Sequence, residues 1–154
     1  HEYLITQVQH QSIAAQANED LNFNHPVKEL IWTGGWGSGL NTALTAEQTF
    51  QLKLNGHDRF AARDRNYFTR TQVWQHHTGY GGLTASAGTS QGNDSIGVYS
   101  FSLKPEEHQP SGTCNFSRID NAQLKSPNDA LHIYAVNYNV LRVMSGMGGL
   151  AYSN

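Results

Sequence analysis

The sequence predicts an all-β domain, an antiparallel jelly-roll sandwich or barrel with one short helix in a connecting loop. Apolar and polar residues alternate with a period of two in several separate segments, which is the pattern of strands with one buried face. Turn-forming Gly, Pro, Asn and Ser residues separate these segments, as is typical of two packed antiparallel sheets. The 154 residues are enough for one domain with its own core, so we expect residues 1–154 to form a single jelly roll.

Three strands are expected in the first half of the chain. The first runs through Leu4–Gln9, where Leu, Thr and Val alternate with Ile and Gln. The second covers Val27–Trp32 and is opened by Pro26, a residue that suits the first position of a strand. The third covers Phe50–Leu54 and stops at an Asn-Gly pair, which favours a turn.

Three further strands are expected in the second half. Tyr99–Leu103 alternates, which places its Tyr, Phe and Leu on one face, and it breaks at a proline. Cys114–Ile119 resumes as an extended segment after a polar corner. Leu131–Val143 is long and rich in β-branched and aromatic residues, and it is the clearest strand in the chain. From this alternation we expect Phe101 and Val136 to lie in the core.

Two kinds of segment depart from the strand pattern. Phe60–Trp74 is the one plausible helix, and we expect it to cap the barrel or to lie across a loop. Gly79–Gly97 is rich in Gly and Ser and is expected to be an exposed loop, with a shorter loop of the same kind at Gly34–Gly39. Neither loop stands between a strand and a helix in the way that a phosphate-binding loop requires.

Composition and charge argue against several classes of protein. Charged residues make up 14% of the chain, against about 25% in a typical soluble domain. The net charge is −2 and Lys and Arg do not cluster, so we expect no direct binding of nucleic acid. No apolar run approaches the ~20 residues that span a bilayer, so we expect no membrane insertion. The single cysteine, Cys114, excludes an internal disulfide and a cysteine-based zinc site, and its expected role is that of a small buried strand residue.

The histidines are the nearest approach to a metal or catalytic site. His57 is followed by Asp58 and Arg59, and His76 and His77 are adjacent. Adjacent residues of an extended chain point to opposite faces, so we do not expect one metal ion to bind both. A cupin-type site would need a His-x-His pair with a following Glu, which the sequence lacks. We therefore expect structural or surface roles, with no metal ligand and no cofactor.

Two further motifs invite a catalytic interpretation. Glu106, Glu107 and His108 are consecutive, whereas general acid–base catalysis needs two carboxylates held apart across a cleft. Ser111 stands in Pro-Ser-Gly-Thr rather than in the Gly-x-Ser-x-Gly of a nucleophile elbow. A hydrogen-bonded corner explains both motifs, so the sequence predicts no catalytic residue and no enzyme.

Tryptophans and glycosylation motifs leave two binding questions open. Trp32, Trp36 and Trp74 could form a sugar-stacking platform in a carbohydrate-binding, lectin-like module, but packing in the core or in an interface is the favoured role. Asn93 and Asn115 each begin an Asn-x-Ser motif for N-glycosylation. Asn93 is the better candidate, because it lies in the predicted exposed loop whereas Asn115 lies in a predicted strand.

Four segments of the chain resemble the major capsid proteins of the nucleocytoplasmic large DNA viruses, the double-jelly-roll family. Each segment alone is a modest match, but they span most of the chain and follow the order of the family. The segments are Asn24–Trp32, Leu54–Phe60 with the Tyr-Phe pair that follows it, Tyr99–Asp120, and Tyr138–Ser153.

The resemblance implies a fold, a role and partners. Family members carry two consecutive jelly rolls, and this chain matches the second, C-terminal one, so we expect a fragment or the ordered part of a longer protein that lacks the N-terminal jelly roll. Three subunits form a homotrimer with six barrels, a pseudo-hexagonal capsomer that tiles an icosahedral shell. The expected partners are the chain itself, neighbouring capsomers and minor capsid proteins. The expected location is the outer capsid shell of a virion assembled in the host cytoplasm.

Overall fold

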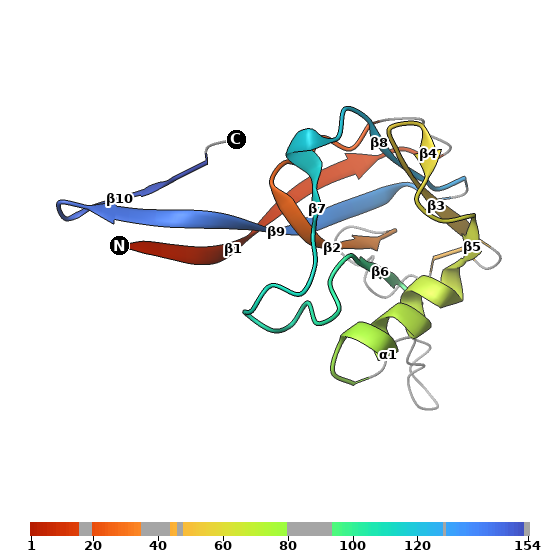
Figure 1. Ribbon diagram of the computed structural model, residues 1–154. Helices are drawn as coiled ribbons and strands as arrows, with labels where there is room; N and C mark the ends of the chain where they lie inside the picture. Colours follow the sequence, from red (N-terminus) through yellow and green to blue (C-terminus); the bar gives the residue numbers. More distant parts are fainter. Residues whose placement is uncertain (16–19, 35–43, 46–47, 80–93, 128, 153–154) are drawn as a thin grey trace.

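Two antiparallel sheets pack face to face in the computed structural model, which describes residues 1–15, 20–34, 44–45, 48–79, 94–127 and 129–152 (Figure 1). The first sheet has the order β1–β9–β2–β6, with β10 beside β9 and β7 beside β2; the second has β3 paired with β4, β5 and β8. The strands of the first sheet are β1 (Glu2–Ile13), β2 (Pro26–Thr33), β6 (Ile96–Ser100), β7 (Cys114–Asn115), β9 (Leu131–Met144) and β10 (Met147–Leu150). Those of the second are β3 (Thr49–Leu54), β4 (His57–Asp58), β5 (Arg63–Asp64) and β8 (Ala122–Lys125). The predicted all-β, antiparallel jelly-roll fold is confirmed.

β9 organises the first sheet. It pairs with β1 from Glu2 opposite Arg142 to Ile13 opposite Leu131, so the ladder joins the two ends of the chain. β2 pairs with the other edge of β9, and the register shifts at Lys28. Alternate residues of β9 are buried, because one face of the strand meets the second sheet and the other faces outward.

Aromatic side chains fill the space between the sheets. Trp32 on β2 is fully buried, and its ring centroid lies 5.2 Å from that of Phe50 and 5.3 Å from that of Phe68. Gly97 on β6 lies opposite Trp32, and a Cβ atom there would stand 2.3 Å from the indole Nε1. A glycine at this position therefore lets the indole pack directly on the strand. Further fully buried side chains around this centre are those of Val27, Leu30, Leu44, Leu52, Leu124, Leu131 and Ile133.

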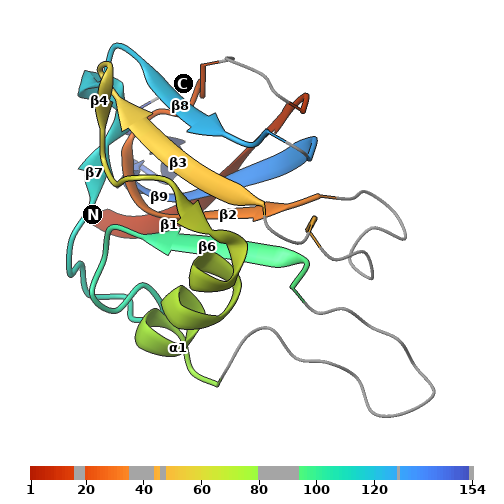
Figure 2. The same cartoon turned by 90° about the vertical axis from the view of Figure 1, so that its right-hand side faces the viewer.

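The helical segment begins later than predicted. A π-helical turn, η2 (Tyr67–Thr71), leads into α1 (Gln72–His76), whereas Arg63–Asp64 forms β5. Gln72 is buried, and its Oε1 accepts a hydrogen bond of 3.1 Å from the backbone N–H of Ser100, which attaches the helix to the end of β6. Figure 2 shows α1 beside β6 at the edge of the sandwich. Within the described residues, no helix is long and apolar enough to cross a bilayer.

β6 ends earlier than predicted. Its last residue is Ser100, whose hydroxyl donates a hydrogen bond of 2.7 Å to the carbonyl of Ser102 and turns the chain away from the sheet. Leu103 is consequently 73% exposed, so its predicted place on the buried face is wrong. Phe101 is half-buried and packs edge-on against Phe116, which places it at the margin of the core.

The predicted strand Cys114–Ile119 is only two residues long. The Asn115 side chain accepts a hydrogen bond of 3.1 Å from the Ser117 N–H, and this begins the 3-10 turn η3 (Phe116–Arg118). The local side-chain bond thus replaces the sheet pairing that an extended segment would need.

The prediction that Val136 lies in the core is also wrong. On β9 the inward positions belong to Ile133, Ala135 and Asn137, so Val136 points to the opposite face. There it is half-buried, opposite Val8 on β1 and Glu29 on β2. The run is apolar on both faces in this region, and alternation alone does not say which face is inside.

One end of the first sheet continues beyond the sandwich as an arm (Figure 1). The arm is built from the start of β1 (residues 2–5), the end of β9 (residues 139–144) and β10. β10 pairs with β9 from Met147 opposite Met144 to Leu150 opposite Leu141. On the other edge of β9, Tyr3 lies opposite Leu141.

Amide side chains lie between the arm and the core. The Asn137 amide donates to Gln9 Oε1 at 2.9 Å, and the Asn139 amide donates to Gln7 Oε1 at 3.1 Å. Asn137 and Asn139 are buried, and a buried amide is costly unless it is hydrogen-bonded. These bonds therefore pin β1 to β9 in one register where the apolar core ends.

Candidate functional site

The residues that suggested metal or acid–base chemistry do not form one site. His57 and Asp58 make the exposed strand β4, where Asp58 forms an ion pair of 3.9 Å with Lys53. His76 and His77 lie instead at the end of α1. Among the residues that the structure describes, no group of three His, Cys, Asp or Glu side chains is placed to hold a metal ion.

His77 is held between two carboxylates. Its Nε2 lies 2.6 Å from Oε2 of Glu29 on β2, and its Nδ1 lies 2.9 Å from Oε1 of Glu106. The same Glu106 oxygen accepts hydrogen bonds from the Thr78 N–H at 3.1 Å and from the Thr78 hydroxyl at 3.3 Å. These three residues, His77, Glu29 and Glu106, are called the His77 cluster. It connects β2 and the end of α1 to the corner, defined as residues 101–112.

The electrostatics of the His77 cluster favour a charged imidazole. The hydrogen bond to Glu29 raises the pKa of His77 most, burial opposes this, and Glu106 adds to the increase. The pKa of Glu106 is lowered, first by the Thr78 N–H and then by His77. An imidazolium donates one hydrogen bond from each nitrogen, which matches the two carboxylates. The nitrogens face opposite ways, so this cluster does not present both to one metal ion.

Glu29 is the member of the cluster that sequence analysis missed. It lies on a strand that was correctly predicted, yet its carboxylate is buried. A charged residue that is fully buried is almost always paired with another group. The two charged residues Lys28 and Glu29 inside an otherwise apolar strand were therefore the sequence signal that partners lie nearby. Lys28 is also buried, and its ammonium nitrogen lies 5.1 Å from the ring centroid of Tyr138.

The corner is held in shape by its own hydrogen bonds. Ser111 Oγ lies 2.9 Å from Ser102 Oγ and accepts a hydrogen bond of 2.9 Å from the Lys104 N–H. The Ser111 carbonyl accepts the Leu103 N–H at 3.3 Å. Ser111 thus builds a turn and has no general base beside it in these contacts. Gly112 has a φ of +136°, and a Cβ there would lie 2.6 Å from the Phe101 carbonyl oxygen.

A second ionic cluster fastens the start of the β6 segment to η2. Arg70 binds Asp94 through two hydrogen bonds, at 2.9 and 2.7 Å, and the Thr69 hydroxyl donates a third at 2.8 Å. Arg65 lies 3.7 Å from the same carboxylate. The Arg70 hydrogen bond lowers the pKa of Asp94 most, with burial opposing it. A carboxylate satisfied in this way is structural, because its oxygens are occupied by the protein.

Trp74 and Leu103 expose large apolar side chains on neighbouring segments. They are 72% and 73% exposed, and His76 Nδ1 lies 3.2 Å from the Leu103 carbonyl oxygen. Trp74, His76 and Leu103 are called the helix–corner surface. Trp32 is buried in the core and Trp36 lies outside the described residues, so the three tryptophans do not form one sugar-stacking platform.

The arm exposes a second group of large apolar side chains. Met144 lies opposite Met147 on one face of the arm, whereas Tyr3 and Leu150 both lie opposite Leu141 on the other face. Exposed apolar surface can mark sites of protein–protein contact, and methionine adapts its shape to a partner. A groove of about 390 Å³ runs beside Arg142 and the two methionines. The exposed fractions range from 47% to 76% in Tyr3, Met144, Met147 and Leu150 of the arm and in Tyr152, which follows β10.

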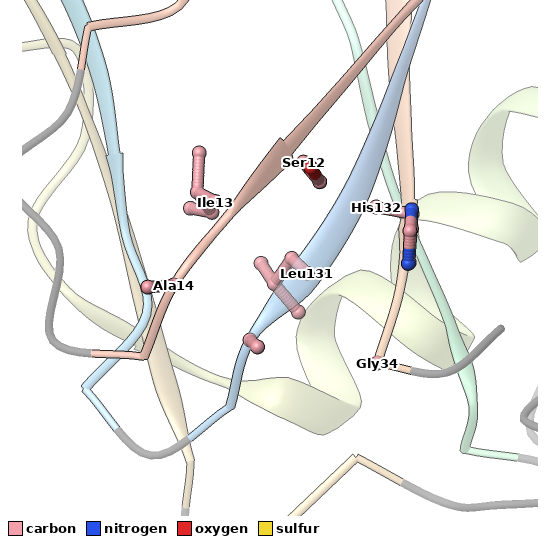
Figure 3. Close-up of a pocket in the computed structure, with 7 residues that line it drawn as sticks. Ser12, Ile13, Ala14, Gly34, Leu131 and His132 are labelled. Carbon is pink, nitrogen blue, oxygen red and sulfur yellow. The ribbon is translucent and has the colours of Figure 1, made fainter.

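A pocket of about 440 Å³ lies where β1 and β2 end and β9 begins (Figure 3). The side chains that line it are small or aliphatic apart from His132, whose Nδ1 lies 3.0 Å from Nε2 of His10. An active site needs several polar groups that converge on one point. These lining residues supply one imidazole and one hydroxyl, which is too few, so we do not treat the pocket as a candidate active site. The lining residues are Ser12, Ile13, Ala14, Gly34, Ala130, Leu131 and His132.

Of the two candidate sites for N-glycosylation, the structure describes only Asn115. Asn115 is half-buried on β7, opposite Pro26, and its side chain is occupied by the Ser117 N–H. Asn93 lies outside the described residues. Cys114 is half-buried, and burial raises the pKa of its thiol, which disfavours the reactive thiolate.

Comparisons of sequence place the chain among viral capsid proteins. A family model for the large eukaryotic DNA virus major capsid protein matches residues 40–130. The major capsid protein of Pyramimonas orientalis virus is 49% identical over 172 residues, which cover all of this chain and 43% of that protein. The major capsid protein of Paramecium bursaria Chlorella virus 1 is 37% identical, with coverage of 100% and 49%. The chain thus spans less than half the length of these relatives.

Comparisons of structure agree with the sequence. The capsid of Paramecium bursaria Chlorella virus 1 matches all of this chain and 52% of the chain in that structure, with a TM-score of 0.77 and 32% identity. The Faustovirus major capsid protein matches 93% of this chain with a TM-score of 0.59, and its 14% identity makes that a likeness of fold alone. From its sequence and its fold together, the chain belongs to the family of large eukaryotic DNA virus major capsid proteins.

Proposed function

We propose that the chain is the C-terminal jelly roll of a structural capsid subunit, which forms homotrimeric, pseudo-hexagonal capsomers in the icosahedral shell of a large DNA virus. The observation that supports this most is the match of the whole chain, in sequence and in fold, to capsid proteins about twice its length. That difference in length supports a second jelly roll N-terminal to this one.

The arm and the helix–corner surface are suited to contacts between copies. In Figure 1 the arm extends to the left, whereas α1 lies at the lower right, so the two surfaces are different and a contact that joins one to the other on the next copy would be head-to-tail. Head-to-tail contacts close into a ring when the rotation between copies permits, and a trimer is such a ring. Each contact can be weak, because a closed shell uses many of them at once.

The same proposal covers partners and location. We assign to the subunit no catalytic activity, no cofactor and no contact with DNA; the net charge of −2 supports the last point. Neighbouring capsomers and minor capsid proteins are the proposed partners, the virion shell is the location and the host cytoplasm is the place of assembly. The relatives favour this structural role over a lectin-like module.

Size measurements on the intact protein test the assembly proposal. We expect light scattering after gel filtration to give a trimer for the unchanged protein. Trp74→Glu and Met147→Glu place a charge on each proposed contact surface and are expected to weaken the trimer or the association of trimers. Gln75→Glu, an exposed neighbour on α1, is the matched control. A stable monomer of the unchanged protein at high concentration would refute the proposal.

We also propose Asn93, rather than Asn115, as an acceptor of N-linked glycan. The Asn115 side chain is half-buried and accepts a backbone hydrogen bond, which argues against its modification. Mass spectrometry of peptides from protein made in its natural host tests this. A glycan on Asn115 with none on Asn93 would reverse the assignment.

A further inference from the structure

The His77 cluster joins three segments that lie far apart in the sequence. Phe101, the first residue of the corner, is held to β2 separately, because its N–H donates a hydrogen bond of 2.9 Å to the Lys28 carbonyl. Glu29 belongs to the central strand β2, His77 follows α1, and Glu106 belongs to the corner. The corner has its own internal bonds through Ser102 and Ser111, so it keeps its shape as a unit. What attaches that unit to α1 is largely polar: the Glu106 contacts and the approach of His76 to the Leu103 carbonyl.

We propose that protonation of His77 controls whether the corner beyond Phe101 stays attached to α1, and therefore whether Trp74 and Leu103 form one surface. The inference rests on the proposed function only in its consequence, because the helix–corner surface is the one assigned above to contacts between copies. The attachment itself depends on the geometry of the His77 cluster and not on assembly.

The chemistry of imidazole gives the reason. A neutral imidazole has one N–H and one lone pair, so it can donate to only one of two carboxylates. In this cluster the lone pair would then face a carboxylate oxygen at 2.6 or 2.9 Å, which is repulsive. Only the imidazolium satisfies both partners at once. Loss of one proton must therefore break one of the two contacts.

Burial decides which contact breaks. The Glu29 side chain is 6% exposed and sits on a central strand, whereas the Glu106 side chain is 41% exposed and sits on the corner. A buried carboxylate left without a donor is costly, but an exposed one is solvated by water. The remaining N–H therefore stays with Glu29. Glu106 moves away, and the part of the corner beyond Phe101, which includes Leu103, moves with it.

The charged surroundings of His77 are limited. Among the described residues, Glu29 from β2 and Glu106 from the corner are the groups that shift its titration. The other charges of the corner, Lys104 and Glu107, pair with each other at 3.7 Å. On the helix side, His76 approaches the Leu103 carbonyl at 3.2 Å. The attachment is accordingly complete below the ordinary His pKa of 6.5 and is lost as the pH rises through the raised pKa of His77.

Hydrogen exchange measured by mass spectrometry on the intact protein tests the inference. The exchange of peptides that cover residues 101–112 is compared between the unchanged protein and His77→Gln at several pH values from roughly 5 to 9. Both proteins are measured at the same pH each time, so the intrinsic exchange rates of the amides cancel. We expect protection of the corner to fall about threefold to tenfold in the unchanged protein as the pH rises. His77→Gln should show low protection without that fall.

Two further variants separate titration from a general loss of structure. Glu29→Gln removes the group that raises the pKa of His77 most, so the midpoint of the fall is expected at a lower pH. His108→Gln changes an exposed histidine of the same corner and should keep the unchanged profile. A corner whose protection does not vary with pH, or a fall that persists in His77→Gln, would overturn the inference.

The oligomeric state, measured in the same samples, separates this inference from the proposed function. A trimer at every pH with a flat exchange profile would refute the His77 inference and leave the capsid assignment standing. A monomer at every pH whose corner still loosens as predicted would refute the trimer and support the action of His77.

Discussion

Substitution of Gly97 by alanine is the most direct test of how the two sheets meet. The new Cβ atom would stand 2.3 Å from Nε1, 2.5 Å from Cε2 and 3.0 Å from Cζ2 of Trp32. Atoms that are not bonded do not approach so closely, so the indole or the strand must move. The indole has little room, because the rings of Phe50 and Phe68 pack against it with centroids 5.2 and 5.3 Å away.

The expected cost follows from that geometry. Overpacking a filled core costs about 1–3 kcal/mol, and alanine returns at most about 1 kcal/mol by restricting the unfolded chain. We therefore expect the free energy of unfolding to fall by about 2 kcal/mol, a change of roughly thirtyfold in the folding equilibrium. Gly148→Ala on β10 is the matched control, since its Cβ would meet nothing within 4 Å.

Urea unfolding of the intact protein, followed by far-ultraviolet circular dichroism, measures the difference. Gly97→Ala should unfold at a lower urea concentration with an unchanged slope, whereas Gly148→Ala should match the unchanged protein. Trp32→Phe removes part of the ring that meets the new Cβ atom. The double variant Gly97→Ala with Trp32→Phe should therefore lose about 1 kcal/mol less free energy of unfolding than the sum of the two single variants. Equal midpoints for Gly97→Ala and the unchanged protein would show that Trp32 does not pack on β6.

Three more predictions concern stability. Phe68→Ala empties a site between four aromatic rings and should cost about 3–5 kcal/mol in urea unfolding; a cost below about 1 kcal/mol would contradict its central position. Ile133→Asp should abolish folding because it buries a charge, and the yield of soluble protein checks this. Val136→Thr on the outer face should change the free energy of unfolding by about 1 kcal/mol or less, and the melting temperature checks this. Asp94→Asn should cost about 1–2 kcal/mol at neutral pH. Because the pKa of Asp94 is lowered, the stability that its carboxylate contributes is fully present above its ordinary pKa of 3.8 and is lost as the pH falls through the lowered pKa. Acid titration should therefore destabilise the unchanged protein more than Asp94→Asn.

Strands that alternate clearly were predictable from the sequence. β2, β3 and β9 were expected within one or two residues of their observed bounds, because their apolar residues repeat with the period of a strand and turn residues bound them. The short elements were not predictable in this way. The Asn115 side chain converts an extended segment into a 3-10 turn, and this competition depends on local hydrogen bonds rather than on hydrophobic pattern.

The His77 cluster shows what pattern reasoning omits. Its members come from positions 29, 77 and 106, and nothing in the spacing of these residues reveals that they meet. The adjacent histidines and the consecutive glutamates were considered only with their sequence neighbours. The separation in sequence therefore hid an arrangement in which one histidine serves two carboxylates. Only the topology of the sandwich brings them together.

The pairing of β1 with β9 also has a consequence for biosynthesis. Partners in this ladder are separated by 118 residues at Ile13 and Leu131 and by 140 residues at Glu2 and Arg142. While the ribosome makes the intervening segments, the first strand has no partner, and its free edge can pair wrongly with other nascent chains. Closure of so long a loop is slow. The domain is thus completed only after its last long strand has been synthesised, and its folding yield should depend on how well that early strand is shielded in the meantime.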